Sequence, residues 1–197
     1  MRQITVFACM LALVLCAGYA VAQTAPPPDT LKVDYFGLSN SEAYDNTFRI
    51  INPGTAGGGL CASIYVFDPY QEMSECCSCA ISPDGLLSLS VNYNLTGNPL
   101  TGVVLNYGVV KVVSSAEKGG TCPTYPSSLT PTAGLRSWMT HVQLSSVNEV
   151  YFETTTETAS QDATLSAAEV KRLQSECYAI QLDGSGKGHC TCSGAPV

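Results

Sequence analysis

The residues with the most evident capacity for chemistry are ten cysteines, and their spacing limits what they can do. Cys9 and Cys16 lie in an apolar N-terminal stretch, and the remaining eight are Cys61, Cys76, Cys77, Cys79, Cys122, Cys177, Cys190 and Cys192. An even number of cysteines in an exported chain is typical of structural disulfides rather than of catalytic thiols. We therefore predict that all eight form disulfides, in a pairing that the sequence alone does not determine.

Five of these cysteines form two clusters, one of Cys76, Cys77 and Cys79 and one of Cys190 and Cys192. Adjacent cysteines within a cluster are poor partners for each other, because such short loops strain the geometry of a disulfide. Each cluster is therefore expected to bond to a distant segment. The same clusters, together with His189, offer an alternative: an extracellular metal-binding domain with a tetrahedral zinc site. Zinc sites usually contain Cys-x2–4-Cys pairs, and the spacing here is tighter. We therefore favour disulfides and expect neither a metal nor a cofactor.

Nucleophilic catalysis receives little support from the sequence. After the N-terminal stretch the chain has two histidines, His141 and His189, and no serine lies in a Gly-x-Ser-x-Gly elbow. We therefore predict no catalytic residue and favour a non-enzymatic protein.

A carbohydrate site is the first alternative. Glu149, Tyr151 and Glu153 alternate along one predicted strand, and pairs of carboxylates can hydrolyse glycosides while tyrosine rings can stack on sugars. These three residues are our candidate binding residues for a protein that binds or cleaves a glycan. Acidic residues at alternate strand positions are, however, more commonly a solvated face of a sheet.

The N-terminus is typical of a signal peptide. Arg2 precedes an apolar run, and Ala20-Val21-Ala22 provides the small-x-small pattern of a cleavage site, so we predict that residues 1–22 are removed. No later apolar run is long enough to span a bilayer, and we therefore expect no stable membrane insertion after cleavage. The short, weakly basic signal favours a bacterial source and a periplasmic, cell-surface or extracellular location.

The charge balance argues against a nucleic-acid partner. The formal net charge is −7, and it becomes −8 once Arg2, the only charged residue among residues 1–22, is removed. Phosphate binding needs clustered lysine and arginine, which this chain lacks. We therefore expect a protein or glycan partner outside the cell and no nucleic acid.

Short alternating segments separated by turn residues predict a mainly β protein: an antiparallel β-sandwich, for which an immunoglobulin-like Greek key is one fitting topology. Predicted strands cover residues 31–36, 47–51, 61–67, 87–92, 103–107, 109–113, 139–144 and 149–154. Residues 71–75 are interpreted as one helical turn that leads into the Cys76 cluster. In the last predicted strand, Val150 and Phe152 are expected to face the core.

A C-terminal helix is predicted from Ser166, which caps it together with Glu169. Val170, Leu173, Cys177 and Ile180 then share one apolar face. The predicted organisation is a signal peptide (1–22), a proline-rich lead-in (23–30), a β-sandwich (31–160), and a helix with a cysteine-rich, disulfide-fastened tail (161–197).

Two segments, Leu60–Leu95 and Leu165–Cys192, resemble exported, cysteine-rich bacterial proteins of unassigned function. That resemblance implies no catalytic residue. Our leading hypothesis is an exported, disulfide-stabilised β-sandwich module with a structural or binding role.

Overall fold

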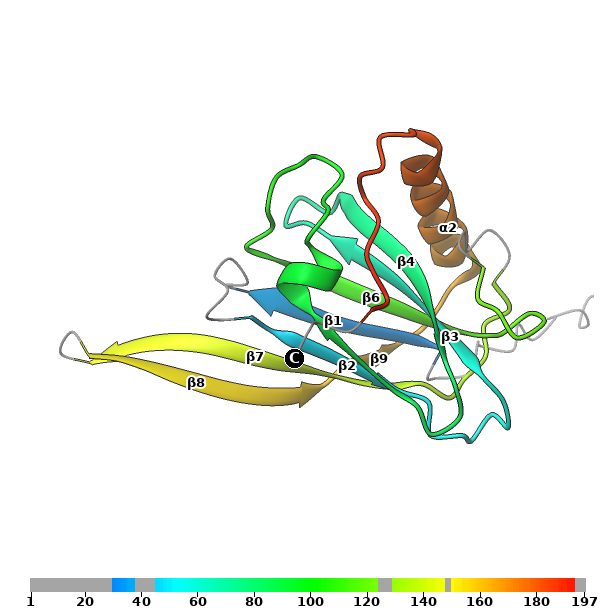
Figure 1. The fold of residues 1–197 in the computed structure, drawn as a ribbon, viewed down its shortest axis with the longest axis horizontal. Helices are drawn as coiled ribbons and strands as arrows, with labels where there is room; N and C mark the ends of the chain where they lie inside the picture. Colours follow the sequence, from blue (N-terminus) through cyan, green and yellow to red (C-terminus); the bar gives the residue numbers. More distant parts are fainter. Residues whose placement is uncertain (1–29, 38–44, 124–128, 148–149, 194–197) are drawn as a thin grey trace, which may run out of the picture.

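The structure is a computed structural model, and it describes residues 30–37, 45–123, 129–147 and 150–193. The predicted signal peptide and all of the lead-in except Thr30 lie outside the described residues. Within the described ranges the chain is mainly antiparallel β, with two packed sheets and one C-terminal helix (Figure 1). The predicted β-sandwich with a C-terminal helix is therefore confirmed.

The larger sheet of the described residues has the strand order β4-β3-β6-β1-β9. Its strands are β1 (Leu31–Gly37), β3 (Leu60–Phe67), β4 (Met73–Ile81), β6 (Tyr107–Ala116) and β9 (Gln161–Ala163). Every residue of β3 is buried because β3 lies between β4 and β6 in the sheet, with packed layers on both of its faces. The central strand is therefore a continuous run of apolar and small residues rather than an alternating one.

The smaller sheet has the order β5-β2-β7-β8 among the described residues. Its strands are β2 (Thr47–Ile51), β5 (Leu86–Ser90), β7 (Arg136–Val147) and β8 (Val150–Ala159), and a short helical turn of the π type, η1 (Val91–Leu95), follows β5. In an immunoglobulin domain the first strand pairs with the second. Here β1 pairs with β6 and β9, so the sandwich has a different strand order.

Two local predictions are wrong. Residues 71–75 do not form a helical turn: β4 begins at Met73 and carries the Cys76 cluster on a strand that pairs with β3. The two short strands predicted on either side of Gly108 are one strand, β6, and Val103 and Val104 are exposed residues of the preceding loop. In both places long-range strand pairing overrides the local turn signal.

Gly108 continues β6 because the strand needs a residue without a side chain at that point. A Cβ atom at Gly108 would lie 2.2 Å from the Phe67 carbonyl oxygen and 2.7 Å from the Phe36 ring. We therefore expect Gly108→Ala to lower the free energy of unfolding by about 2 kcal/mol through overpacking. Chemical denaturation measures this, with Gly58→Ala, where a Cβ atom would meet nothing within 4 Å, as a comparison for glycine loss without crowding.

Two apolar clusters hold the layers together. The first fills the space between the sheets and includes Phe36, Phe48, Ile64 and Met139. The second packs α2 (Ala167–Leu182) against the other face of the larger sheet, with Leu173, Cys177 and Ile180 of the helix buried there. The predicted apolar face of the helix is therefore the face that packs on the sheet.

Helix α2 begins at the position that the predicted capping residue Ser166 indicates. The Ser166 hydroxyl accepts a hydrogen bond from the Glu169 backbone N–H at 3.1 Å. The Glu169 carboxylate binds Arg172 at 2.9 Å and Lys111 of β6 at 2.7 Å, and these bonds, that to Arg172 most of all, lower the pKa of Glu169 to about 2. The helix is thereby tied to the sheet by charge as well as by apolar packing.

After α2 the tail returns along β4 and covers its outer edge (Figure 1). The Cys76 N–H donates to the Gly188 carbonyl at 2.9 Å, and the Cys190 N–H donates to the Cys76 carbonyl at 3.4 Å. The Thr191 N–H donates to the Asn94 carbonyl at 3.0 Å. The backbone N–H and C=O of Cys76, which an edge strand would otherwise present to other chains, are therefore paired within the protein.

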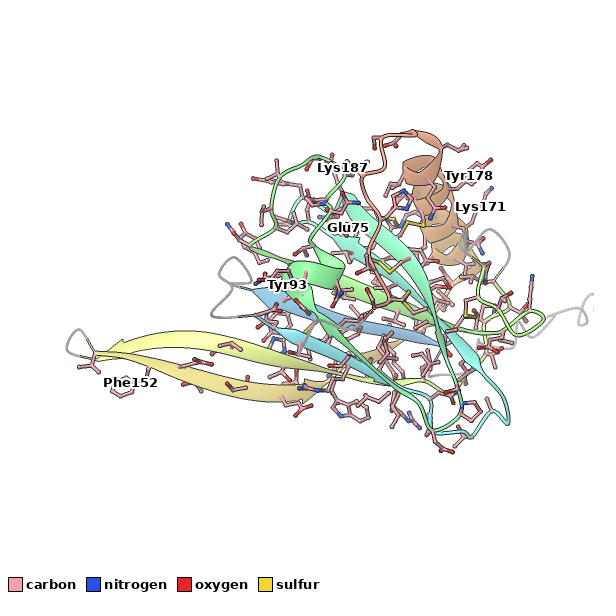
Figure 2. The ribbon with its side chains drawn as sticks, in the orientation of Figure 1. Glu75, Tyr93, Phe152, Lys171, Tyr178 and Lys187 are labelled. Atoms are coloured by element: carbon pink, nitrogen blue, oxygen red, sulfur yellow. A yellow bond between two sulfur atoms is a disulfide. The ribbon has the colours of Figure 1, made fainter. Side chains whose placement is uncertain are left out.

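A buried carboxyl lies close to this tail. Glu75 is fully buried, and its Oε1 accepts the Asn98 backbone N–H at 2.9 Å, whereas Oε2 has no hydrogen-bond partner among the described residues. Burial raises the pKa of Glu75 to about 8, against smaller lowering effects of the Asn98 bond and of Lys187. Figure 2 labels both Glu75 and Lys187 on this side of the molecule.

None of the helices in the described ranges has the length and apolar character that crossing a bilayer requires.

Candidate functional site

A cleft with a volume of about 350 Å³ opens at the edge of the sandwich where the chain passes from β8 to β9. The smaller sheet contributes the end of β8, and the larger sheet contributes β1, β6 and the start of β9. The lining is mostly apolar and consists of Val33, Asp34, Tyr35, Val109, Thr158, Ala159 and Gln161. A concave apolar surface with a few polar groups is the usual form of a ligand site.

Asp34 is the charged residue among those that line this cleft, and its buried carboxylate is fixed in position by hydrogen bonds. Its Oδ2 accepts the Ser160 hydroxyl at 2.8 Å, and its Oδ1 accepts the Tyr35 backbone N–H at 2.9 Å. Ser160 is held in turn by the Ser137 hydroxyl at 2.8 Å and donates its backbone N–H to the Ser137 carbonyl at 3.0 Å. The corner between β8 and β9 therefore orients a buried acid.

His141 of β7 completes the polar network. Its Nε2 lies 2.9 Å from the Thr158 hydroxyl and 3.8 Å from Asp34 Oδ1, and its ring stacks on Tyr35 with 4.4 Å between the ring centroids. In a catalytic triad the acid and the nucleophile contact opposite nitrogens of the histidine. Here the same nitrogen faces both Asp34 and Thr158, so this arrangement orients groups without activating a hydroxyl.

Burial and hydrogen bonding act in opposite directions on Asp34. Desolvation raises the pKa of its carboxyl above the ordinary value, whereas the bonds from Ser160 and Tyr35 and the nearby His141 lower it. Desolvation is the larger effect. Within the described residues, the only ion-pair partner of Asp34 is His141, whose charge depends on pH.

The predicted carbohydrate site lies on a different part of the protein, the β7–β8 hairpin. Glu149 lies outside the described residues, and Tyr151 is placed as a β8 residue opposite Ser146, without a described side chain. Glu153 is exposed on β8. The three residues therefore remain a prediction, since the structure describes the side chain of only one of them.

The expectation that Val150 and Phe152 face the core is wrong. Val150 is 54% exposed and Phe152 is 50% exposed. The physical reason is that β7 and β8 are longer than predicted and extend beyond the opposing sheet, as Figure 1 shows. Phe152 lies near the far end of this hairpin in Figure 2, where no second layer covers it.

All eight cysteines of the described chain are in disulfides. Cys61 bonds to Cys122, Cys76 to Cys177, Cys77 to Cys190, and Cys79 to Cys192. The cluster on β4 is thus joined to the helix and to the tail, and no bond forms within a cluster. Four disulfides are typical of a protein that folds in an oxidising environment.

The same bonds bear on the zinc alternative. The sulfur atoms of Cys77, Cys79 and Cys192 lie within 4.8 Å of one another, which is close enough to surround an ion. Metals bind the thiolate form of cysteine. Each of the three sulfurs is instead bonded to another sulfur, so the arrangement observed is that of structural disulfides.

Sequence reasoning missed the cleft residues Asp34, Tyr35 and Ser160. Asp34 and Tyr35 lie within the predicted strand 31–36, and the sequence analysis assigns no role to Ser160. One signal was available: Asp34 occupies a position in β1 that alternation assigns to the buried side, together with Phe36. A charged residue at a buried position indicates a specific polar partner.

Comparisons of the chain with protein families, with curated proteins and with solved structures found no match.

Proposed function

We propose that this protein is a non-enzymatic module, exported from the cell, whose disulfide-locked sandwich presents the edge strand β8 to a partner protein at the cell surface or outside the cell. The observation that carries the proposal is the difference between β8 and the other outer strands. The described sheets end in β4, β9, β5 and β8. An uncovered edge presents backbone donors and acceptors that another chain can pair with.

Three of these edges are short or covered. The tail bonds to β4 through Gly188 and Cys190. Strand β9 has 3 residues, and β5 has 5 and continues directly into η1. Strand β8, by contrast, has 10 residues, and its register with β7 runs from Trp138–Ala159 to Val147–Val150 without a shift. It is therefore a long, regular edge.

The side chains of β8 suit strand addition. Residues 152–159 are all exposed, and four of the eight are threonines, which have high β propensity. In strand addition, backbone hydrogen bonds supply affinity and alternate side chains supply specificity. Glu153 favours a partner strand that carries a basic residue and disfavours a second copy of this acidic chain, whereas Glu157 already pairs with Arg49 at 3.6 Å.

Export is tested by the intact mass of the protein recovered from its native host. We expect a mature chain that starts at Gln23 and carries no thiol that reacts with an alkylating agent before reduction. A retained N-terminus, or thiols that alkylate freely in the native protein, would argue against the exported module.

The role of β8 is tested by placing lysines on the edge, because edge lysines block strand pairing. We expect Thr154→Lys with Thr156→Lys to reduce capture of the partner at least tenfold, while the free energy of unfolding changes by no more than about 0.5 kcal/mol. Capture is measured by photo-crosslinking on the native cell surface, from a reactive residue placed at position 152, an exposed position of β8.

The matched control is Thr55→Lys with Thr101→Lys, two exposed loop positions that receive the same charge. Capture should survive in this control. Equal loss in both double variants would mean that charge alone acts, and unchanged capture in the β8 variant would show that β8 is not the contact.

A further inference from the structure

We infer that the cleft at the base of β8 is a specificity pocket, which takes a large apolar side chain at the end of the partner strand that adds to β8. This inference rests on the proposed strand addition and gives the partner strand a definite chemistry at one position. The place where the β8 edge ends, the apolar walls of the cleft and the bonded state of its polar groups all support this assignment.

The free side of β8 follows from its hydrogen bonds to β7. The Ser160 N–H donates to the Ser137 carbonyl at 3.0 Å, and these two residues continue the β7–β8 register. In an antiparallel pair, alternate residues direct their backbone groups to the same side. Even-numbered residues of β8 therefore face β7, and the backbone groups of odd-numbered residues, Ala159 among them, face the free side. A strand that adds to β8 would bond to these odd-numbered residues.

Strand β1 occupies the same side farther along the chain. The Ser114 N–H donates to the Thr30 carbonyl at 2.8 Å, so odd-numbered residues of β1 face away from β6 and towards β9. The register between β1 and β9 runs up to the pair of Val33 and Gln161. Because β1 fills the edge from Gln161 onwards, a strand that adds to β8 has to end next to β1.

The cleft is the opening between the two strands at this point. Continued by two residues, the β1–β9 register would bring Tyr35 opposite Ala159. The Tyr35 N–H donates instead to Asp34 Oδ1 at 2.9 Å, and Tyr35 and Ala159 both line the cleft. The last residue of an added strand would therefore lie beside Ala159, at the mouth of the cleft.

The walls of the cleft are apolar. Val33, Val109 and Ala159 contribute aliphatic groups, and Tyr35 contributes a ring that is held by its stack on His141. Placing an apolar side chain against such walls removes apolar surface from water on both partners. The cleft therefore favours leucine, isoleucine, valine, methionine or phenylalanine at this position of the partner strand.

The polar groups of the lining already have partners within the protein. The Asp34 carboxylate is 5% exposed and accepts a hydrogen bond at each oxygen. The Thr158 hydroxyl lies 2.9 Å from His141 Nε2, and Gln161 is exposed to solvent. A charged side chain would lose water here without gaining an open charge among the described lining residues, whereas an apolar side chain loses no hydrogen bond.

The chemistry of the occupant is tested by a second crosslinking position in the capture experiment on the native cell surface. A small diazirine-bearing residue is placed at position 159, which is exposed, and mass spectrometry identifies the partner residue that becomes attached. We expect attachment at or next to a large apolar residue. Attachment centred on a charged residue would overturn the assignment.

The aromatic wall is tested separately, with capture from position 152 as the readout. Tyr35→Ala should reduce capture at least fivefold, whereas Tyr35→Phe, which keeps the ring, should capture as the wild type does. Tyr107→Ala is the matched control, because Tyr107 is 57% exposed, against 56% for Tyr35, and lies outside the lining of the cleft. If Tyr35→Ala fails to fold, the crosslink from position 159 still decides the question.

Strand addition and the specificity pocket fail in different experiments. Thr154→Lys with Thr156→Lys tests strand addition, and Tyr35→Ala tests the pocket. Capture that is lost in the lysine variant and unchanged in Tyr35→Ala would overturn the pocket and leave strand addition standing. Unchanged capture in the lysine variant would contradict strand addition, and this inference with it.

Discussion

Replacing Cys61 and Cys122 together with alanine should lower the free energy of unfolding by about 4 kcal/mol, the largest loss for any of the four disulfides. The two residues are 61 positions apart, and no other disulfide provides a shorter connection between them. A bridge stabilises mainly by restricting the unfolded chain, and the restriction grows with the length of the loop that it closes. Denaturation in guanidinium chloride measures the loss.

The other three bonds join residues that are farther apart in the sequence, by 101, 113 and 113 positions. Each of them nevertheless closes a smaller ring than Cys61–Cys122 does, because the neighbouring disulfides already connect the same segments. With Cys77–Cys190 intact, Cys79–Cys192 closes a ring of only about six residues, so its removal should cost about 2 kcal/mol. Cys76–Cys177 closes a ring of about 16 residues and should cost about 3 kcal/mol. A larger loss at Cys79–Cys192 than at Cys61–Cys122 would contradict this ranking.

Glu75→Gln should make the protein more stable than the wild type above pH 8 and should flatten the dependence of stability on pH. The pKa of Glu75 is about 8 in the folded state, against 4.5 for an ordinary glutamate. Between these values the folded state holds a proton that the unfolded state has lost. The stabilisation is complete below the unfolded pKa, and it decreases by up to about 1.4 kcal/mol per pH unit as the pH rises towards 8.

The measurement is the free energy of unfolding of both proteins from pH 5 to pH 9. Glu72→Gln, at an exposed position, controls for the loss of one charge and should follow the wild-type curve. Identical slopes in Glu75→Gln and wild type would mean that Glu75 does not titrate in this range.

The sequence predicts the fold well wherever a strand is half-buried or a helix has one apolar face. Residues 47–51 form a strand with the predicted bounds, and the face of α2 that contains Leu173 and Cys177 is buried as expected. Both are local patterns with a single buried side, and such patterns can be recognised in the sequence without knowledge of the segments that pack against them.

Features that depend on distant partners were not predictable in this way. The segment before Cys76 is a strand because β3 pairs with it, and the hairpin is exposed because the opposing sheet ends before it does. The disulfide pairing depends on the tail lying alongside β4. The cleft depends on Asp34 and Ser160, which are 126 residues apart and form a site only after the sheets have packed.

The bond between Cys79 and Cys192 also changes how the protein responds to mechanical tension. If residues 30 and 193 are pulled apart, the load follows the chain from 30 to 77 and then divides between two paths of equal length to 192, one through each of the bonds Cys79–Cys192 and Cys77–Cys190. Residues 80–189 lie outside both paths and add nothing to the extension. The oxidised protein should therefore stretch to roughly 170 Å, against roughly 550 Å after reduction. A domain built in this way extends only through its first three strands and most of the fourth under load, while the rest remains a covalently closed loop.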